Sequence, residues 1–250
     1  MKNRLALAAA TLPLAVAAFV PGHAVTAEPD PGKEQSPIDI RHRDLDHALL
    51  PVLDFDYPDD SEVTMTYIRE DADDPDGCEV RGEEETVRAE VPPGTASLTV
   101  GGDEYELLQV HWHTPSEHHL DGRSYPLEQH LVHRNSDGEL LVVGVWVRRG
   151  AAHNTLGRLF DHLAEECEPN IAVTDISLRK LLPDRITSYR YPGSLTTAPY
   201  SEDVSWVMLT DPVSASARQV ALFRDAFPDG NSRDVQPLGD RTVLTDRWLH

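Results

Sequence analysis

Residues Leu107 to Arg134 read LLQVHWHTPSEHHLDGRSYPLEQHLVHR, and this stretch predicts two strands that share a metal site. Side chains two apart on a strand point to the same face, so His111 and His113 share a face. His130 belongs to a same-face set on the second predicted strand, and the polar connection with its Asp-Gly pair is long enough to return the chain antiparallel. The pairing would place three histidines around one point.

Three imidazoles with a fourth position open are the ligand set of catalytic zinc. The candidate zinc ligands are therefore His111, His113 and His130. A ligating imidazole usually donates its other N–H to an acceptor that fixes its orientation. Gln109 lies two residues before His111 and Glu128 two before His130, so each can supply such an acceptor.

Each of these residues also has an ordinary interpretation, which stays open at this point. A lone histidine in a strand is usually a hydrogen-bonded structural residue, Gln109 and Glu128 could be solvated, and Glu117 could cap a turn. The joint pattern favours the metal site. The other histidines of the stretch, which we leave outside the ligand set, are His118 and His119 in the connection and His133 on the opposite strand face.

The rest of the chain predicts one β-rich domain. No repeat or Gly/Ser linker divides it, and short apolar runs alternate with Pro, Gly, Asp and Asn. Spacing on one face predicts helices at Thr155–Cys167 and Ser214–Phe223. The predicted strands are Val63–Ile68, Thr86–Val91, Ala96–Val100, Tyr105–His113, Leu127–His133, Leu140–Val147 and Val204–Leu209. We therefore expect a β-rich α+β fold with short peripheral helices.

The N-terminal residues have the pattern of a secretory signal peptide. Lys2 and Arg4 precede an apolar run that ends at a small-residue site at 25–27. The run is short for a membrane span, although a retained anchor is the alternative. We predict that residues 1–27 are a signal peptide, that 28–250 form a single domain, and that the protein is secreted or extracytoplasmic, in the periplasm or outside the cell.

The composition is strongly acidic, with 43 Asp and Glu against 22 Lys and Arg. Negative charge repels nucleic-acid phosphates and anionic lipid heads, so it argues against nucleic acid and stable membrane association. Cys78 and Cys167 remain in an exported chain, where disulfides persist, and a pair is favoured over two free thiols. The sequence does not show whether the two meet, and it leaves the oligomeric state open.

Five motifs resemble the α-class carbonic anhydrases of the secreted bacterial type. They are QSPIDI at Gln35–Ile40, HWHTPSEH at His111–His118, LEQHLVH at Leu127–His133, YPGSLTTAP at Tyr191–Pro199 and VQPL from Val235. The resemblance implies a central twisted, mostly antiparallel ten-stranded sheet with a conical cleft that reaches zinc. It also implies that residues 28–250 are a catalytic domain for the zinc-dependent, reversible hydration of CO2 to bicarbonate and a proton, by attack of zinc-bound hydroxide.

The resemblance assigns roles residue by residue. His111, His113 and His130 match the zinc ligands. Their other nitrogens would be held by Gln109, Glu128 and the backbone carbonyl of Asn231. Glu117 and Thr196 match the pair that orients the zinc-bound hydroxide, with Thr197 beside them. The wall where carbon dioxide rests would comprise Val132, Val142, Leu195, Val204 and Trp206.

The proton route departs from the family pattern. Aligned on Val91–Gly94, Glu85 stands where many fast members carry a histidine shuttle. A glutamate with a pKa near 4.3 is poorly matched to a donor near 7. We therefore expect no histidine shuttle, and turnover that is limited by proton transfer and rescued by imidazole.

Two other functions are the alternatives to the enzyme. A catalytically silent, carbonic-anhydrase-like binding module is the main alternative, but such relatives usually lose a zinc histidine, whereas all three stand here together with Glu117 and Thr196. A zinc hydrolase of esters or peptides is the other, and the sequence lacks its His-Glu-x-x-His helix.

Overall fold

The computed structural model describes residues 32, 34–69, 78, 82 and 84–246. The chain divides into residues 1–30 and a second unit, residues 31–250, and everything below concerns the second. The predicted signal peptide and its cleavage site lie outside the described residues. None of the helices within the described ranges is long and apolar enough to cross a membrane.

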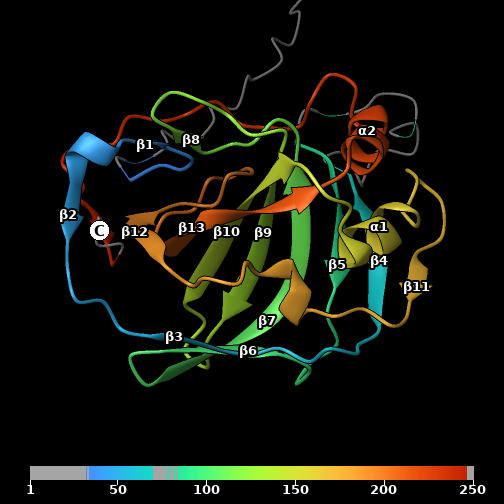
Figure 1. Cartoon of the computed structure of the whole chain (residues 1–250), viewed down its shortest axis with the longest axis horizontal. Coiled ribbons are helices and arrows are strands. Elements are labelled where there is room, and N and C mark those ends of the chain that lie inside the picture. The colour runs from blue at the N-terminus through green and yellow to red at the C-terminus, as the bar shows by residue number, and fades with distance from the viewer. Residues whose placement is uncertain (1–31, 33, 70–77, 79–81, 83, 247–250) are drawn as a thin grey trace, which may run out of the picture. The chain divides into compact units, whose positions relative to one another are not determined.

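One large twisted sheet dominates this unit (Figure 1). Ten of its strands form a continuous path, and β3 (Leu53–Asp56) and β6 (Ser97–Val100) extend it beside β7. In spatial order the path is β11 (Ile171–Val173), β4 (Val63–Ile68), β5 (Thr86–Glu90), β7 (Asp103–His113), β9 (Leu127–Arg134), β10 (Leu140–Arg149), β13 (Val204–Ala215), β12 (Ser188–Gly193), β14 (Val243–Thr245) and β2 (Leu45–His47).

Most neighbouring strands run antiparallel, which confirms the predicted mostly antiparallel sheet. The pairs β10–β13 and β14–β2 are parallel, so the sheet is mixed. A separate pair, β1 (Asp39–Ile40) and β8 (His119–Leu120), is also parallel. Short 3-10 turns occur at His42–Asp44 and Arg179–Leu181.

Alternation along the central strands divides the apolar residues between two faces. On one face, Trp112 of β7 contacts Phe160 of α1 (Asn154–Phe160) and Phe223 of α2 (Ala217–Ala226), with ring centroids 5.3 and 6.5 Å apart. We call this the helix face; it also carries Leu131 of β9. The opposite face, which carries His111 and His130, is the histidine face.

Both helices are confirmed, but with different bounds. The predicted helix Thr155–Cys167 is observed from Asn154 to Phe160, and the i→i−4 pattern then gives way to a turn in which His162 N donates to Leu159 O at 3.0 Å. Cys167 has a φ of 60°, a left-handed conformation that an α-helix cannot contain.

The predicted helix Ser214–Phe223 begins later, at Ala217. β13 continues to Ala215, and Ser216 and Gln219 then form a capping box that fixes the first turn.

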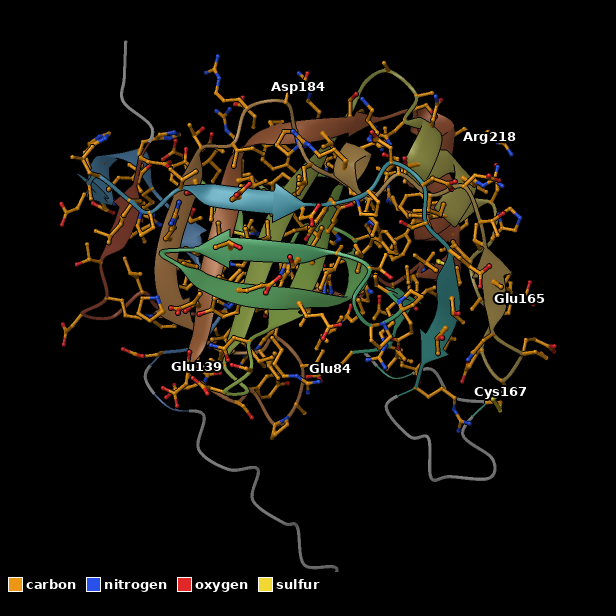
Figure 2. The ribbon with its side chains drawn as sticks, turned by 90° about the horizontal axis from the view of Figure 1, so that it is seen from below. Glu84, Glu139, Glu165, Cys167, Asp184 and Arg218 are labelled. Atoms are coloured by element: carbon orange, nitrogen blue, oxygen red, sulfur yellow. A yellow bond between two sulfur atoms is a disulfide. The ribbon has the colours of Figure 1, made fainter. Side chains whose placement is uncertain are left out.

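Cys78 and Cys167 form a disulfide, so the pairing that the sequence favoured is confirmed. Their Cα atoms lie 6.1 Å apart and their sequence separation is 89. Cys167 lies on the loop that precedes β11 (Figure 2). A link across a loop of this length constrains the unfolded chain by about 4–5 kcal/mol in chain-entropy models.

Candidate metal centre and cleft

Strand register aligns the central side chains of the histidine face in one row. Arg88 of β5 pairs with His111 of β7, His111 with His130 of β9, and His130 with Gly144 of β10. Directly opposite residues have Cβ atoms about 4.5–5.5 Å apart. Gly144 leaves room for the side chain of Met208 on β13, whose Sδ would lie 2.1 Å from a Cβ at this position.

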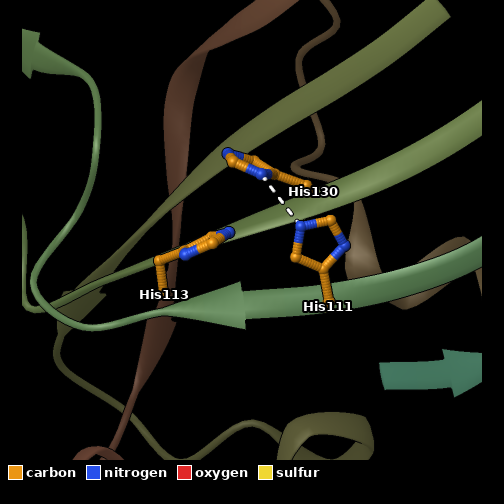
Figure 3. Close-up of side chains that lie close together, drawn as sticks. All are labelled: His111, His113 and His130. Carbon is orange, nitrogen blue, oxygen red and sulfur yellow. Dashed lines mark hydrogen bonds between the residues drawn. The ribbon is translucent and has the colours of Figure 1, made fainter. Parts of the chain in front are cut away.

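His111, His113 and His130 converge on one point, as the strand spacing predicts (Figure 3). One ring nitrogen from each lies within 4.8 Å of the others. Nδ1 of His130 lies 3.3 Å from Nε2 of His111. The ring of His113 completes the group, with its centroid 5.0 Å from that of His111 and 4.8 Å from that of His130.

The other nitrogen of each ring faces an acceptor. His111 Nδ1 lies 2.9 Å from Gln109 Oε1, and His130 Nε2 lies 2.7 Å from Glu128 Oε1. His113 Nδ1 lies 2.7 Å from the carbonyl oxygen of Asn231. Carbonyl and carboxylate oxygens only accept, so these three nitrogens carry the protons.

The nitrogens that face one another therefore carry lone pairs. They are Nε2 of His111, Nε2 of His113 and Nδ1 of His130, and His113 Nε2 is buried without a hydrogen-bond partner among the described residues. An unpaired buried acceptor is costly unless something binds it. The donor set fits a zinc ion, which takes neutral imidazole nitrogens in tetrahedral sites.

Burial favours the neutral, metal-binding form of two of these imidazoles, those of His111 and His113. It lowers the pKa of His111 well below the ordinary value, and the neighbouring His113, His130 and Arg88 lower it further. Burial also lowers the pKa of His113, against the opposing effect of Glu117. A neutral ring is the ligand form, so these two histidines do not have to release a proton before they bind a cation.

Glu128 connects the ligand His130 to a buried chain of hydrogen bonds. Its carboxylate accepts from Nδ1 of His118 at 2.7 Å and from the backbone N–H of His118 at 2.8 Å. His118 Nε2 lies 2.6 Å from Tyr191 Oη, which lies 2.8 Å from Ser36 Oγ. Burial opposes the ionisation of Glu128, but His118 and His130 outweigh it and lower its pKa well below the usual range.

The sequence predicted that His118 lies outside the zinc ligand set but did not predict its hydrogen bonds to Glu128. His118, Glu128 and His130 also lie close enough together to be considered as a metal group. Their contacts are hydrogen bonds to one shared carboxylate oxygen, Glu128 Oε1. The arrangement orients His130 and leaves its Nδ1 for the other histidines. In the sequence, only its place next to Glu117 in the HWHTPSEH motif distinguishes His118 from the other histidines outside the ligand set.

A cleft of about 1100 Å3 opens beside His113. Glu117, Thr196 and Thr197 line it, so the structure brings these predicted residues together. Glu117 Oε1 accepts from the backbone N–H of Arg233 at 2.9 Å, whereas Glu117 Oε2 is buried and has no hydrogen-bond partner among the described residues. Thr196 and Glu117 thus share the cleft but are not joined by a hydrogen bond.

The predicted apolar wall lies beside the histidines. Val132, Val142 and Trp206 stand opposite one another in the β9–β10–β13 register, and the Trp206 ring centroid lies 4.9 Å from that of His130. Val204 belongs to the same buried cluster, and Leu195 packs against it.

Glu85 does not line this cleft, which argues against its predicted place on the proton route. Its side chain is buried and accepts from Tyr67 Oη at 2.7 Å, and its carbonyl accepts from Asn231 Nδ2. The preceding residue, Glu84, lines the cleft instead, as does His119. One position separates two glutamates with opposite environments, and a run of three glutamates gives no signal for which one faces inward.

Comparisons with known proteins agree with this geometry. The profile of the family "Eukaryotic-type carbonic anhydrase" matches residues 24–247. A carbonic anhydrase of Nostoc sp. is 34% identical over 215 residues, which cover 85% of this chain and 76% of the relative. One of Pectobacterium carotovorum is 36% identical over 160 residues, covering 64% of this chain and 65% of the relative, just under two thirds of its length.

Solved structures show the same similarity. The α-carbonic anhydrase of Thermovibrio ammonificans, solved in complex with sulfanilamide, superposes with a TM-score of 0.74 at 34% identity, over 85% of this chain and 87% of that chain. The Photobacterium profundum α-carbonic anhydrase gives a TM-score of 0.72 at 34% identity, over 86% and 90%.

Proposed function

Because the chain belongs to the eukaryotic-type carbonic anhydrase family, whose α-class enzymes are zinc-dependent lyases, we propose that it hydrates carbon dioxide reversibly to bicarbonate and a proton. The observation that carries the proposal is the set of three converging imidazoles. Each has its outer nitrogen held by an acceptor, and the inner nitrogen of His113 is buried without a partner among the described residues.

Zinc would be held by His111 Nε2, His113 Nε2 and His130 Nδ1. Bound there, a zinc ion supplies hydroxide at neutral pH by lowering the pKa of water to about 7. Gln109, Glu128 and the Asn231 carbonyl fix the three ring orientations before the ion arrives, so little reorganisation accompanies binding.

Thr196 and Glu117 would orient the attacking oxygen. Thr196 Oγ can accept a hydrogen bond from that oxygen only if its own proton is donated elsewhere. Glu117 Oε2 is a buried acceptor that receives no hydrogen bond from any described residue, and both residues line the same cleft. A Thr196 hydroxyl that donates to Glu117 would leave a lone pair of the nucleophile directed at the substrate, which lowers the cost of attack.

The apolar wall would hold carbon dioxide beside the metal centre. Carbon dioxide is apolar, so a dry aliphatic and aromatic surface binds it without hydrogen bonds. Val132, Val142 and Trp206 form such a surface next to His130. Thr197 lines the adjoining cleft, through which bicarbonate can leave.

Stopped-flow measurement of carbon dioxide hydration by the purified protein tests the proposal, with zinc content determined alongside. We expect chelator-sensitive turnover that rises with imidazole, because the family resemblance puts Glu85 rather than a histidine at the shuttle position, and Glu85 is buried outside the cleft lining. A folded, zinc-loaded protein without activity would favour the binding-module alternative. Turnover that is independent of buffer would contradict the missing shuttle and direct attention to His119 in the cleft wall.

We also propose that the protein is exported. The N-terminal pattern of Lys2, Arg4 and an apolar run supports this, as does the Cys78–Cys167 disulfide, because such links persist mainly in oxidising compartments. N-terminal sequencing of the mature protein checks it: a start at residue 28 is expected. An intact Met1 in the cytoplasmic fraction would contradict export.

A further inference from the structure

The loop that carries Thr196 and Thr197 is held in a closed shape by its own backbone. We call residues 194–203, between β12 and β13, the threonine loop. Leu195 N donates to Ser201 O at 2.9 Å, and Tyr200 N donates to Thr197 O at 2.9 Å. From outside the loop, Ser36 N donates to Ser194 Oγ at 2.9 Å and Gln35 Nε2 donates to Tyr200 O at 3.2 Å. These two bonds hold the loop at Ser194 and at the Tyr200 carbonyl, and neither of them reaches the backbone of residues 196–198.

Glu84 binds this loop from a distant part of the chain. It lies just before β5, and its separation from Ala198 is 114 residues. Glu84 Oε2 accepts from the backbone N–H of Ala198 at 2.7 Å, and Glu84 Oε1 accepts from Tyr200 Oη. Figure 2 shows Glu84 among the described side chains at the edge of the unit. One carboxylate therefore fixes the loop at two points, and hydrogen bonds to an ionised acceptor are the stronger kind.

Tyr200 extends this connection to Glu117. The Arg233 guanidinium carbon lies 3.7 Å from the centroid of the Tyr200 ring, a cation–π contact. The backbone N–H of Arg233 donates to Glu117 Oε1 at 2.9 Å, and its Nη1 donates to Ser36 O at 2.6 Å. The two residues that the proposed mechanism needs, Thr196 and Glu117, are thus connected through Tyr200 and Arg233, with Glu84 at the outer end.

We propose that Glu84 is a positioning residue for the hydration reaction. Its carboxylate holds the threonine loop against the cleft, and with Tyr200 and Arg233 it keeps Thr196 in register with Glu117. The inference rests on the proposed function for its catalytic consequence, but the contacts themselves stand without it. A displacement of about 1 Å in an orienting group can reduce a rate by about 100-fold.

Three variants and one matched control test the proposal. E84A removes both acceptor oxygens, E84Q keeps one carbonyl oxygen, and Y200F removes the phenol donor while it keeps the ring against Arg233. D229N is the control, because Asp229 is an exposed acid that lines the same cleft and forms no hydrogen bond or ion pair with any described residue. D229N removes one negative charge from the cleft, as E84A and E84Q do.

Hydrogen–deuterium exchange of the threonine loop is the primary readout. We expect exchange in peptides that cover 194–203 to be at least about 10-fold faster in E84A, intermediate in E84Q and Y200F, and unchanged in D229N. Peptides from β7 and β9 should keep their protection in all four. Zinc content should stay at the wild-type level, and kcat/KM for carbon dioxide hydration should fall about 10–100-fold in E84A, because the attacking oxygen loses its orientation and kcat/KM does not include the proton-transfer step that limits kcat.

Unchanged exchange in E84A would overturn the proposal, whatever its activity. An equal fall of kcat/KM in D229N would also overturn it, since the effect would then belong to cleft charge. If E84A does not fold, Y200F decides: faster loop exchange supports the proposal and wild-type exchange contradicts it. An inactive wild-type protein would refute the proposed function alone, because the exchange comparison would still report on the contacts of Glu84.

Discussion

Strand β9 carries two buried histidines on opposite faces of the sheet, and their ring nitrogens have different partners. His133, on the helix face, uses both ring nitrogens: Nδ1 lies 3.2 Å from the carbonyl oxygen of Leu141, and Nε2 lies 2.5 Å from Tyr57 Oη. His130, on the histidine face, uses Nε2 toward Glu128 and directs Nδ1 at another imidazole nitrogen, that of His111. Both residues are buried.

Burial of a histidine therefore does not identify a metal site in this protein. The difference lies in which nitrogens already have partners. Both ring nitrogens of His133 already have hydrogen-bond partners, and burial lowers its pKa to about 4. On the histidine face each imidazole has one nitrogen held by an acceptor and one directed at the common point. We infer that the helix face supplies stability and the histidine face supplies the chemistry.

The substitution with the largest expected effect on the histidine face is His113→Ala. We expect zinc content to fall from one ion per chain to near zero, and carbon dioxide hydration to fall by at least about 1000-fold, because two imidazoles remain for the metal. His133→Gln is the matched control, since it removes a buried histidine from the other face. Zinc retained by His113→Ala, or lost by His133→Gln, would contradict the assignment of the metal site to the histidine face.

Phe223→Ala makes the complementary change on the helix face. Phe223 is fully buried in α2 against Trp112 and Phe160, so the cavity should lower the free energy of unfolding by about 3–5 kcal/mol. The folded fraction should keep its full zinc content. Urea unfolding and metal analysis of the same preparation check both, and zinc loss from the folded variant would show that the two faces are not independent.

Glu128→Gln should have a smaller effect on the histidine face. The variant replaces a carboxylate that accepts from both His118 and His130, and loss of such a partner typically weakens metal binding about 10–100-fold. Competition with a chelator measures the zinc affinity. Glu90→Gln serves as the control, because Glu90 lies on the same face and bonds to Arg88 rather than to a histidine. Equal losses in the two variants would assign the effect to net charge.

The smallest expected effect is a pH dependence of the free energy of unfolding, which arises from His133 on the helix face. The pKa of His133 is about 4 in the fold and about 6.5 in the unfolded chain, so the unfolded state binds more protons between these values. Stability should therefore fall as the pH drops through that window, and this group should contribute a loss of about 2 kcal/mol between pH 7 and 4.5.

Urea unfolding of metal-free protein at both pH values measures this loss. In His133→Gln the difference between the two pH values should shrink by about that amount. An unchanged difference would mean that His133 is not the group that responds.

The sequence predicted the central strands and the metal ligands because local spacing determines both. Alternation located β4, β7, β9 and β10, and spacing by two placed His111 and His113 on one face. The six-residue β12 and the four-residue β3 were not predicted, and neither were the strands of two or three residues, β1, β2, β8, β11 and β14. They are held by neighbours rather than by a pattern of their own, and a strand of three residues, such as β14, cannot show alternation.

Contacts between distant segments were the other limit. The carbonyl of Asn231 could be proposed only by resemblance, because it reaches His113 across 118 residues. Glu84 carried no signal within the acidic run, because it bonds to Ala198, 114 residues away in the sequence. Tyr200 and Arg233 carried no local signal, because their contact forms only when the threonine loop meets the C-terminal segment.

The most direct measurement of the central claim is a crystal structure of the zinc-loaded protein with anomalous scattering recorded at the zinc edge. We predict a single peak within about 2.0–2.1 Å of His111 Nε2, His113 Nε2 and His130 Nδ1. A peak among His118, Glu128 and His130, or no peak at the three histidines in protein that contains zinc, would contradict the claim that this face of the sheet is the metal centre.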